Sequence, residues 1–434
     1  MVALNTTRAR VAIVAGARTP FVKMGGALRD VHVADLAKVA LQETLYRAGW
    51  NPDRLDEVIL GNVVMPADAT NLGRVAALYA GVPHRVPALT VQRNCASGIE
   101  AIADAANKIR AGQGAAILAG GAESMSTIPL LLPQESLAPF GQLARAKSLM
   151  QKVGAVATLR PRHLKPIAAL ECGLTDPACG MIMGKTAELL ASEFGISRRE
   201  QDEWALRSHQ RAGAAIEAGR LKDEIVPVYA GKRFEPVTAD IGPRGNQTIE
   251  ALAKLKPIFD RRDGTVTVGN SCQVTDGAAT VLAMDADLAK AEGLEPLGYV
   301  RAYAYAGLDP ARMGLGPVYA MNQLFRATGL RPSDVPLFEL NEAFAAQAIA
   351  CLKAMASPSF AKDKLNRSEP WGEIDTDRVN VNGGAIALGH PVGATGARIV
   401  LTLLHEMRRR DVDLGIATLC VGGGQGAAML LERS

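Results

Sequence analysis

Three residues of this chain are suited to chemistry at a thiol: Cys95, His390 and Cys420. Cys95 lies in NCASGIEA, where an apolar segment gives way to a helical pattern and small residues leave room for a bulky electrophile. A thiol at the N-terminal end of a helix lies near free N–H groups and the positive end of the helix dipole, which lower its pKa. The position predicts a nucleophilic cysteine, and the alternative is a buried structural one.

His390 follows Gly389 in a glycine-rich loop ahead of a second helical pattern, a place that presents a side chain better than it packs one. We interpret its imidazole as the base that removes the proton of Cys95, with a structural histidine as the alternative. Cys420 precedes three glycines in LCVGGGQG. Exposed N–H groups there predict an oxyanion hole, and a second thiol could transfer a proton to or from carbon.

Asn341, in NEAFAAQ after the strand-like LFEL, is a fourth candidate, and a helix cap is its alternative role. The six cysteines form no CxxC pair and the six histidines are dispersed, so the sequence predicts no metal site. The segment 179–186, CGMIMGKT, resembles a phosphate loop, but its glycine spacing is one residue short and no strand precedes it. We therefore expect no nucleoside triphosphate site.

The elements that must position these residues alternate along the chain. Residues 11–21, 56–64 and 116–126 read as buried strands, and residues 33–49 have a helical pattern. Strands that alternate with helices predict a largely parallel sheet covered on both faces.

The segments 93–124 and 388–426 have the same organisation, because each runs from a loop through a helix to a strand that ends in glycines. Aligning Gly98 with Gly396 requires one short insertion between the copies and places Cys95 and His390 in corresponding loops. This pattern predicts a duplicated half in which the two residues face each other. Two unrelated strand–turn–helix units are the alternative.

The stretch 127–275 loses the regular alternation and predicts an inserted domain. Within it, residues 136–170 contain basic but no acidic side chains. The basic residues are Arg145, Lys147, Lys152, Arg160, Arg162 and Lys165. They predict a surface for phosphate groups, an anionic membrane or an acidic partner, unless they form only a solvated face.

Composition sets the class of the protein. Of 434 residues, 48% are hydrophobic and 21% charged, which is typical of a globular α/β protein of enzyme size. A net charge of +4 is too small to indicate a nucleic-acid partner. No apolar run suits a signal peptide or a membrane span, so we expect a cytoplasmic protein with free thiols.

Six motifs in series resemble those of the thiolases. In chain order they are NCASGIEA, GGAESMS, GTVTVGNSCQVTDGAA, NEAFAAQ, NGGAIALGHPVGATGAR and CVGGGQG. The resemblance implies the α/β thiolase fold, with two duplicated five-layer αβαβα halves and an inserted loop domain. The expected N-terminal half covers residues 1–126 and is completed by about 276–296, the coenzyme A-binding loop domain covers 127–275, and the C-terminal half covers 297–434. Family members are usually dimers or tetramers.

The resemblance also implies roles for the candidate residues. Cys95 takes the acyl group as a thioester, and His390 activates it. With a water held by Asn341, His390 stabilises the enolate oxygen of the leaving acetyl-CoA. Cys420 acts as acid or base at the α-carbon, and the N–H groups of Cys95 and Gly422 form a second oxyanion hole.

No permanently bound cofactor is implied, and coenzyme A (CoA) is expected as a cosubstrate. Arg244 aligns with a basic residue near the nucleotide end, and Met183, Leu255 and Cys272 are the other expected CoA contacts. Cys272 stands where many relatives have Ser or Thr. Ile182 stands where short-chain biosynthetic members have His, which disfavours an acetoacetyl-specific enzyme.

The resemblance favours a 3-ketoacyl-CoA thiolase, which cleaves its substrate with CoA to acetyl-CoA and a shortened acyl-CoA in fatty-acid β-oxidation. The alternatives are a biosynthetic acetoacetyl-CoA thiolase and a non-catalytic scaffold subunit, which would not need all three reactive residues. The length and the basic segment resemble β-subunits of fatty-acid oxidation complexes, although those often have His at the position of Asn341. We therefore expect residues 136–170 to contact a hydratase/dehydrogenase partner or a membrane.

Overall fold

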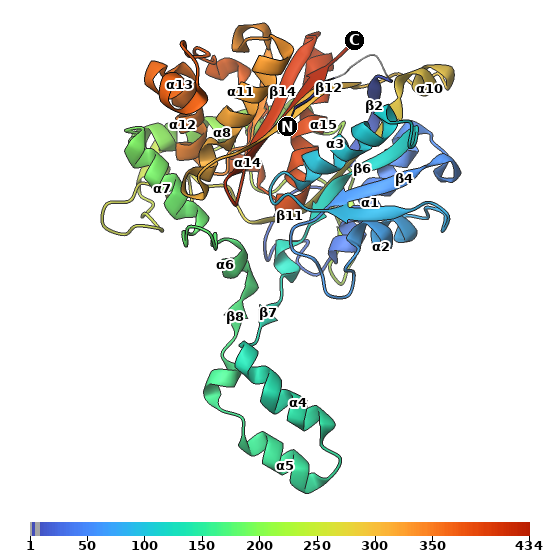
Figure 1. Ribbon diagram of the computed structural model, residues 1–434, viewed down its shortest axis with the longest axis vertical. Coiled ribbons are helices and arrows are strands. Elements are labelled where there is room, and N and C mark those ends of the chain that lie inside the picture. Colours follow the sequence, from blue (N-terminus) through green and yellow to red (C-terminus); the bar gives the residue numbers. More distant parts are fainter. Residues whose placement is uncertain (1, 5–8) are drawn as a thin grey trace.

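The computed structural model describes residues 2–4 and 9–434. Over these residues the chain forms a curved sheet of eleven strands, whose main path has the order β13-β14-β15-β12-β2-β11-β6-β4-β5 (Figure 1). The bounds of these strands are β2 (Val11–Arg18), β4 (Glu57–Gly61), β5 (Ala88–Val91), β6 (Ala116–Glu123), β11 (Thr275–Asp285), β12 (Gly298–Gly307), β13 (Leu337–Leu340), β14 (Leu414–Val421) and β15 (Gln425–Glu432). The two halves of the sheet join where β2 pairs with β12.

The sheet is mixed, so the prediction of a largely parallel sheet is wrong. Parallel pairing holds for β4 with β5 and β6, and for β13 with β14. By contrast, β11 is antiparallel to both β2 and β6, and β15 is antiparallel to both β12 and β14. Helix–strand alternation constrains only strands that a helix connects. The strand β11 enters the sheet after the long insertion, and β15 returns through a tight turn where Gly423 and Gly424 have φ of 86° and 72°.

Four strands follow the same order in both halves, β2-β11-β6-β4 and β12-β15-β14-β13, as a duplication requires, and β5 extends the first half by one strand. Between the halves lie α3 (Ser97–Arg110) and α15 (Val392–Arg410), which share one hydrophobic core with strands of both halves. The outer faces are covered by α1 (Val33–Ala48) and α2 (Leu72–Tyr79) on one side and by α11 (Gly316–Thr328) and α12 (Ala345–Ala356) on the other. The two halves together thus build the five layers of the fold.

The helices α3 and α15 touch backbone to backbone at the two glycines that the sequence repeat aligns. An added Cβ on Gly98 would lie 2.5 Å from the amide nitrogen of Ala397, and one on Gly396 would lie 2.4 Å from that of Ile99. Only glycine permits this approach. Because Gly98 is the second residue of α3 and Gly396 the fifth of α15, the crossing lies near the N-terminal ends of both helices.

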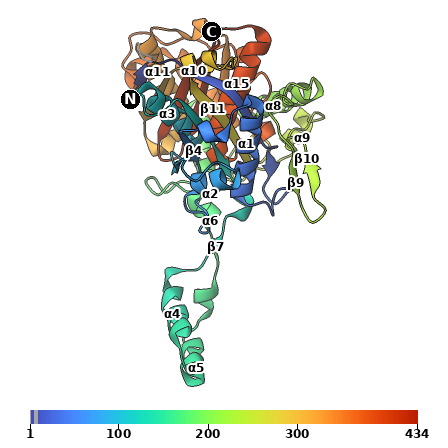
Figure 2. The same cartoon turned by 90° about the vertical axis from the view of Figure 1, so that its right-hand side faces the viewer.

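The insertion between β6 and β11 has two different parts. The helices α7 (Met183–Glu193) and α8 (Arg198–Glu217) pack on the C-terminal half against α12. The helices α4 (Leu137–Arg145) and α5 (Leu149–Ala157) form a hairpin that projects from the body on the short strands β7 (Leu130–Leu131) and β8 (Ile167–Ala168) (Figures 1 and 2). No helix of the described residues is long and apolar enough to cross a membrane.

Candidate active site

Cys95 lines a cavity of 430 Å³ at the N-terminal end of α3. The backbone N–H groups of Cys95 itself and of Gly422 lie close enough to its sulfur to lower the pKa of the thiol. The preceding residue, Asn94, has a left-handed backbone (φ 43°), and its Nδ2 donates to the Gly422 carbonyl at 2.8 Å. The structure therefore places at one sulfur the two N–H groups that were expected to form an oxyanion hole.

The environment of Cys95 is less favourable to a thiolate than its position in the sequence suggested. Burial raises the pKa of the thiol, and the negative charge of Glu123 raises it further, while the two N–H groups lower it. The expectation of a lowered pKa is wrong for this structure, because the loss of hydration outweighs the helix terminus. Cys95 is a protonated thiol at neutral pH and requires a base.

His390 is the residue expected to act as that base. Nδ1 of His390 lies 2.6 Å from the hydroxyl of Thr395, which is itself 2.9 Å from the carbonyl of Pro391. In the tautomer with the proton on Nδ1, the hydroxyl accepts from the ring and donates to that carbonyl. The buried Nε2 then has a free lone pair, and it has no hydrogen-bond partner among the described residues. Burial, with a smaller effect of Arg398, lowers the pKa of His390 to about 3, so the ring is neutral at pH 7.

Two further thiols lie close to Cys95. Burial raises the pKa of Cys272 to about 12 and the pKa of Cys420 well above its usual value, and the charge of Cys95 contributes to both shifts. Cys420 is at the end of β14, where it packs with Met183 and Phe344. Both thiols keep their protons at neutral pH, so either can donate a proton.

Asn341 is buried directly after β13, and neither its Oδ1 nor its Nδ2 has a hydrogen-bond partner in the part of the chain that the structure describes. It is not a helix cap, since α12 begins at Ala345 with Phe344 as its cap. An unpaired buried amide is costly, which marks a place for a water or a substrate atom.

The segment 270–275 connects this amide to the histidine. The N–H of Cys272 donates to the Ala343 carbonyl at 3.0 Å, and the N–H of His390 donates to the Gln273 carbonyl at 3.2 Å. A second acceptor for the His390 N–H is the Thr275 hydroxyl at 3.1 Å. The loops that carry Asn341, Cys272 and His390 are thus bound to one another.

The four expected CoA contacts do not share one cavity. Met183 lines the cavity of Cys95, and Cys272 lies near Cys95, but Arg244 and Leu255 do not line that cavity. Arg244 is exposed, and its backbone N–H donates to Nδ1 of His209 at 3.2 Å. The carbonyl of Leu255 accepts from Arg198 at 3.0 Å.

Sequence reasoning missed most of the cavity wall, which is largely apolar. Its apolar side chains include Val63, Val64, Met125, Ile128, Leu170, Leu174, Met183 and Val392. They come from separate loops on both halves and from the base of the hairpin, and no single motif joins them. Sequence reasoning also gave no role to Thr395, or to Glu123, whose position at the end of an apolar strand was the available signal.

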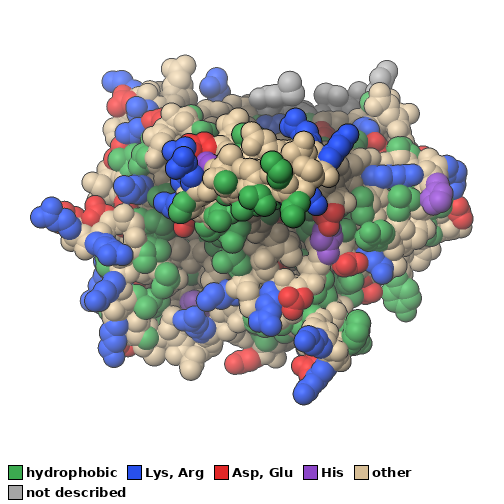
Figure 3. Space-filling view, turned by 90° about the horizontal axis from the view of Figure 1, so that it is seen from below, with side chains coloured by type: hydrophobic (Ala, Val, Ile, Leu, Met, Phe, Trp, Pro, Cys, Tyr) green, Lys and Arg blue, Asp and Glu red, His purple; other side chains and the backbone are tan. Residues whose placement is uncertain are grey.

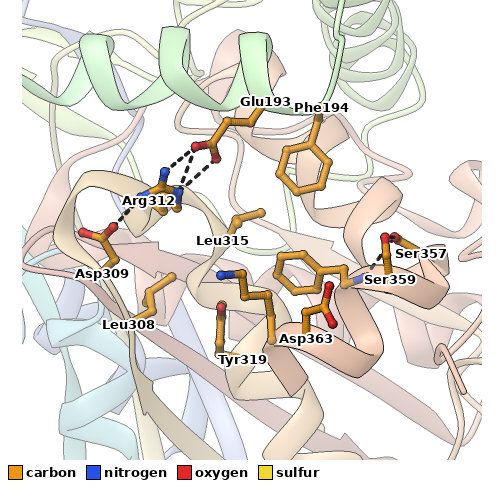
Figure 4. A pocket seen from close by; sticks show the side chains of 12 residues that line it. Glu193, Phe194, Leu308, Asp309, Arg312, Leu315, Tyr319, Ser357, Ser359 and Asp363 are labelled. Atoms are coloured by element: carbon orange, nitrogen blue, oxygen red, sulfur yellow. Dashed lines mark hydrogen bonds and ion pairs between the residues drawn. The ribbon is translucent and has the colours of Figure 1, made fainter. Parts of the chain in front are cut away.

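A second cavity, of 580 Å³, contains none of the candidate residues. It lies where α7 ends beside α11 and α13 (Pro358–Leu365), with Phe194, Tyr319 and Phe360 in its wall (Figure 4). Arg312 points toward this cavity and is held by Glu193 and Asp309.

Comparisons with known proteins agree with this geometry. The model of the thiolase N-terminal domain matches residues 11–287, and that of the thiolase C-terminal domain matches residues 294–433. A 3-ketoacyl-CoA thiolase of Yersinia enterocolitica is 42% identical over 424 residues, covering 98% of this chain and 97% of that protein. Among solved structures, the acetyl-CoA acetyltransferase of Bacillus anthracis superposes with a TM-score of 0.86 at 40% identity, covering 98% of this chain and 99% of that chain. Human mitochondrial 3-ketoacyl-CoA thiolase in complex with CoA superposes with a TM-score of 0.85 at 35% identity, covering 98% of each chain.

Proposed function

The chain belongs to the thiolase family of acyltransferases, and on that basis we propose that it cleaves 3-ketoacyl-CoA with CoA to acetyl-CoA and a shortened acyl-CoA. The main structural support for this proposal is that Cys95 lines an apolar cavity of 430 Å³. An acyl chain gains free energy by filling such a space, whereas an acetyl group leaves most of it empty. The cavity thus favours a degradative enzyme over an acetoacetyl-CoA thiolase.

The proposed reaction begins when Nε2 of His390 takes the proton of Cys95 and the thiolate attacks the 3-keto carbon. The N–H groups of Cys95 and Gly422 stabilise the resulting oxyanion. The bond between C2 and C3 then breaks, which leaves an acyl thioester on Cys95 and the enolate of acetyl-CoA. His390 and a water on Asn341 stabilise the enolate oxygen, and Cys420 supplies the proton to carbon.

In the second half of the reaction CoA is the nucleophile. The thiol of CoA loses its proton to the Cys420 thiolate left by the first half and attacks the thioester carbonyl, which lies at the same pair of N–H groups. Collapse of that intermediate releases the shortened acyl-CoA, and the Cys95 thiolate regains its proton from His390.

We infer that the enzyme works in the cytoplasm, where a reducing environment keeps the thiols of Cys95, Cys272 and Cys420 free of disulfide bonds.

Thiolysis of 3-ketoacyl-CoA substrates from four to sixteen carbons tests this proposal, with acetyl-CoA release as the readout. We expect kcat/KM to increase from four carbons toward longer chains. Activity confined to four carbons would assign the acetoacetyl-CoA reaction instead. If protein that circular dichroism shows to be folded is inactive at every chain length, the scaffold role is the remaining alternative.

We also propose that the α4–α5 hairpin binds an anionic membrane surface. The nine-residue helix α5 exposes Leu149, Met150, Val153 and Val156, with Met150 86% exposed. Seen from the hairpin end of the molecule, apolar side chains gather at the centre, with Lys and Arg side chains on either side (Figure 3). Apolar side chains that enter the headgroup region, bordered by cations, are typical of interfacial helices.

Co-sedimentation with phosphatidylserine vesicles tests the hairpin. Wild-type protein is expected to bind at low salt and to dissociate at high salt, while Met150→Ser/Val153→Ser loses binding and keeps its thiolysis rate. Phosphatidylcholine vesicles are the lipid control. Phe234→Ser, which removes an apolar side chain that is 74% exposed elsewhere, is the matched variant. The membrane proposal is wrong if wild-type protein does not bind the vesicles. If the protein instead captures a hydratase/dehydrogenase subunit, and this capture requires the hairpin, the hairpin binds a protein partner.

The oligomer is a separate proposal. The strand β5 ends the main path of the sheet, and its half-buried residues leave an edge at which a second copy could pair. We infer a homodimer or a tetramer built from such dimers, which light scattering of the purified protein measures directly.

A further inference from the structure

Glu123 is a fully buried carboxylate at the end of β6, and none of the ion pairs between described residues includes it. Four N–H groups satisfy its oxygens instead. Oε1 accepts from Nδ2 of Asn62 at 2.9 Å and from the N–H of Val64 at 3.1 Å. Oε2 accepts from the N–H of Val63 at 2.9 Å and from the N–H of Gly393 at 3.1 Å.

These four donors come from both halves of the molecule. Residues 62–64 form the loop after β4, and Gly393 lies in the first turn of α15, three residues after His390. The N–H groups of a first turn have no partner within their helix, and an anion there is favoured by the helix dipole. Val63, Val64 and Val392 line the cavity of Cys95, so Glu123 joins the two halves directly behind the wall of that cavity.

The carboxylate also influences the nucleophile. Burial raises the pKa of Glu123 to about 7, although its four N–H donors oppose the shift. Because every partner is a donor, only the ionised form satisfies them all. Its negative charge raises the pKa of Cys95. Asp276 on β11, next to the residue that pairs with Glu123, instead accepts from the N–H and hydroxyl of Ser126.

We propose that Glu123 is a positioning residue that holds the 62–64 loop against the first turn of α15 and so sets the places of His390 and the cavity wall relative to Cys95. The proposal rests on the proposed function only in treating Cys95 as the nucleophile. It differs from a purely structural role because Glu123 acts on two quantities that can be measured at Cys95 itself: the rate of turnover and the pH at which the thiol ionises.

Glu123→Gln preserves the shape of the side chain, removes the charge and points an amide N–H₂ at two of the four donors. We expect kcat to decrease by on the order of 10²-fold, because displacements of about 1 Å in an active site have effects of that size. The pH midpoint of Cys95 alkylation by iodoacetamide, followed by peptide mass spectrometry, should shift downward since a neighbouring negative charge is gone. Glu123→Asp keeps the charge, so its midpoint should remain near that of wild type while kcat recovers only in part.

Glu224→Gln is the matched control. This second buried glutamate accepts from Arg18 and Thr402 at 2.7 and 2.8 Å and does not line the cavity. It should lower the melting temperature and leave kcat and the alkylation midpoint unchanged. The proposal is overturned if Glu123→Gln shows only this control behaviour, or, should that variant not fold, if Glu123→Asp has the wild-type kcat. Alkylation is measured without substrate, so the two proposals can fail separately. If the wild-type protein shows no thiolysis but Glu123→Gln still shifts the midpoint of Cys95 alkylation, the proposed function is wrong and the role of Glu123 at Cys95 still holds.

Discussion

Cys95→Ser is expected to lower kcat for thiolysis by on the order of 10⁴-fold or more, the scale seen when a covalent nucleophile is removed. A serine hydroxyl ionises far less readily than a thiol, and burial already raises the pKa at this position. A neutral His390 is too weak a base to compensate for that difference. Steady-state rates of acetyl-CoA release measure the loss, and intact-protein mass spectrometry should detect an acyl adduct on wild type alone.

Cys179→Ser is the control for this result. Cys179 is a half-buried free thiol in the insertion and does not line the cavity. It should keep the wild-type rate and the acyl adduct. If Cys95→Ser retained activity within tenfold of wild type, the thioester mechanism would have to be abandoned.

His390→Gln is expected to lower kcat by about 10²- to 10⁴-fold, the usual contribution of a general base. The variant keeps a polar group in the buried site but has no nitrogen lone pair to take the proton of Cys95. Alkylation of Cys95 at pH 7 should slow as well, which separates loss of the base from loss of substrate binding. Stopped-flow alkylation and steady-state thiolysis provide the two rates.

His405→Gln is the matched variant, since His405 lies in α15, the helix that follows His390, and burial lowers its pKa too. It should alter stability without changing either rate. Equal rates for wild type and His390→Gln would reassign the proton transfer, and Cys420 would be the next candidate.

The candidate catalytic residues could be selected from the sequence because each lies in a short motif with recognisable local chemistry. The repeat aligned Gly98 with Gly396, and the structure shows those two glycines at one helix crossing. Strand directions were less predictable. The place of β11 depends on pairing with β2 and β6 across a long insertion, and no local pattern encodes such a pairing.

The electrostatic environment of the site was also beyond local inference. The helix terminus at Cys95 is visible in the sequence, but the burial that overrides it comes from side chains on several distant loops. The same holds for Glu123, whose partners Val63 and Gly393 lie far apart in the chain. A buried polar group without a hydrogen-bond partner, such as the amide of Asn341, can be recognised only when the positions of all its neighbours are known.

The late position of β11 in the chain has a consequence for biosynthesis. A ribosome completes β2 and β6 long before it makes the strand that must lie between them. Until then β2 has no partner strand and β6 is paired on one side only, with β4. Closing this half of the sheet requires contacts across a large sequence separation, which is slow. Exposed strand edges of this kind aggregate. We therefore expect efficient folding in the cell to depend on a chaperone that shields these edges while the insertion is synthesised.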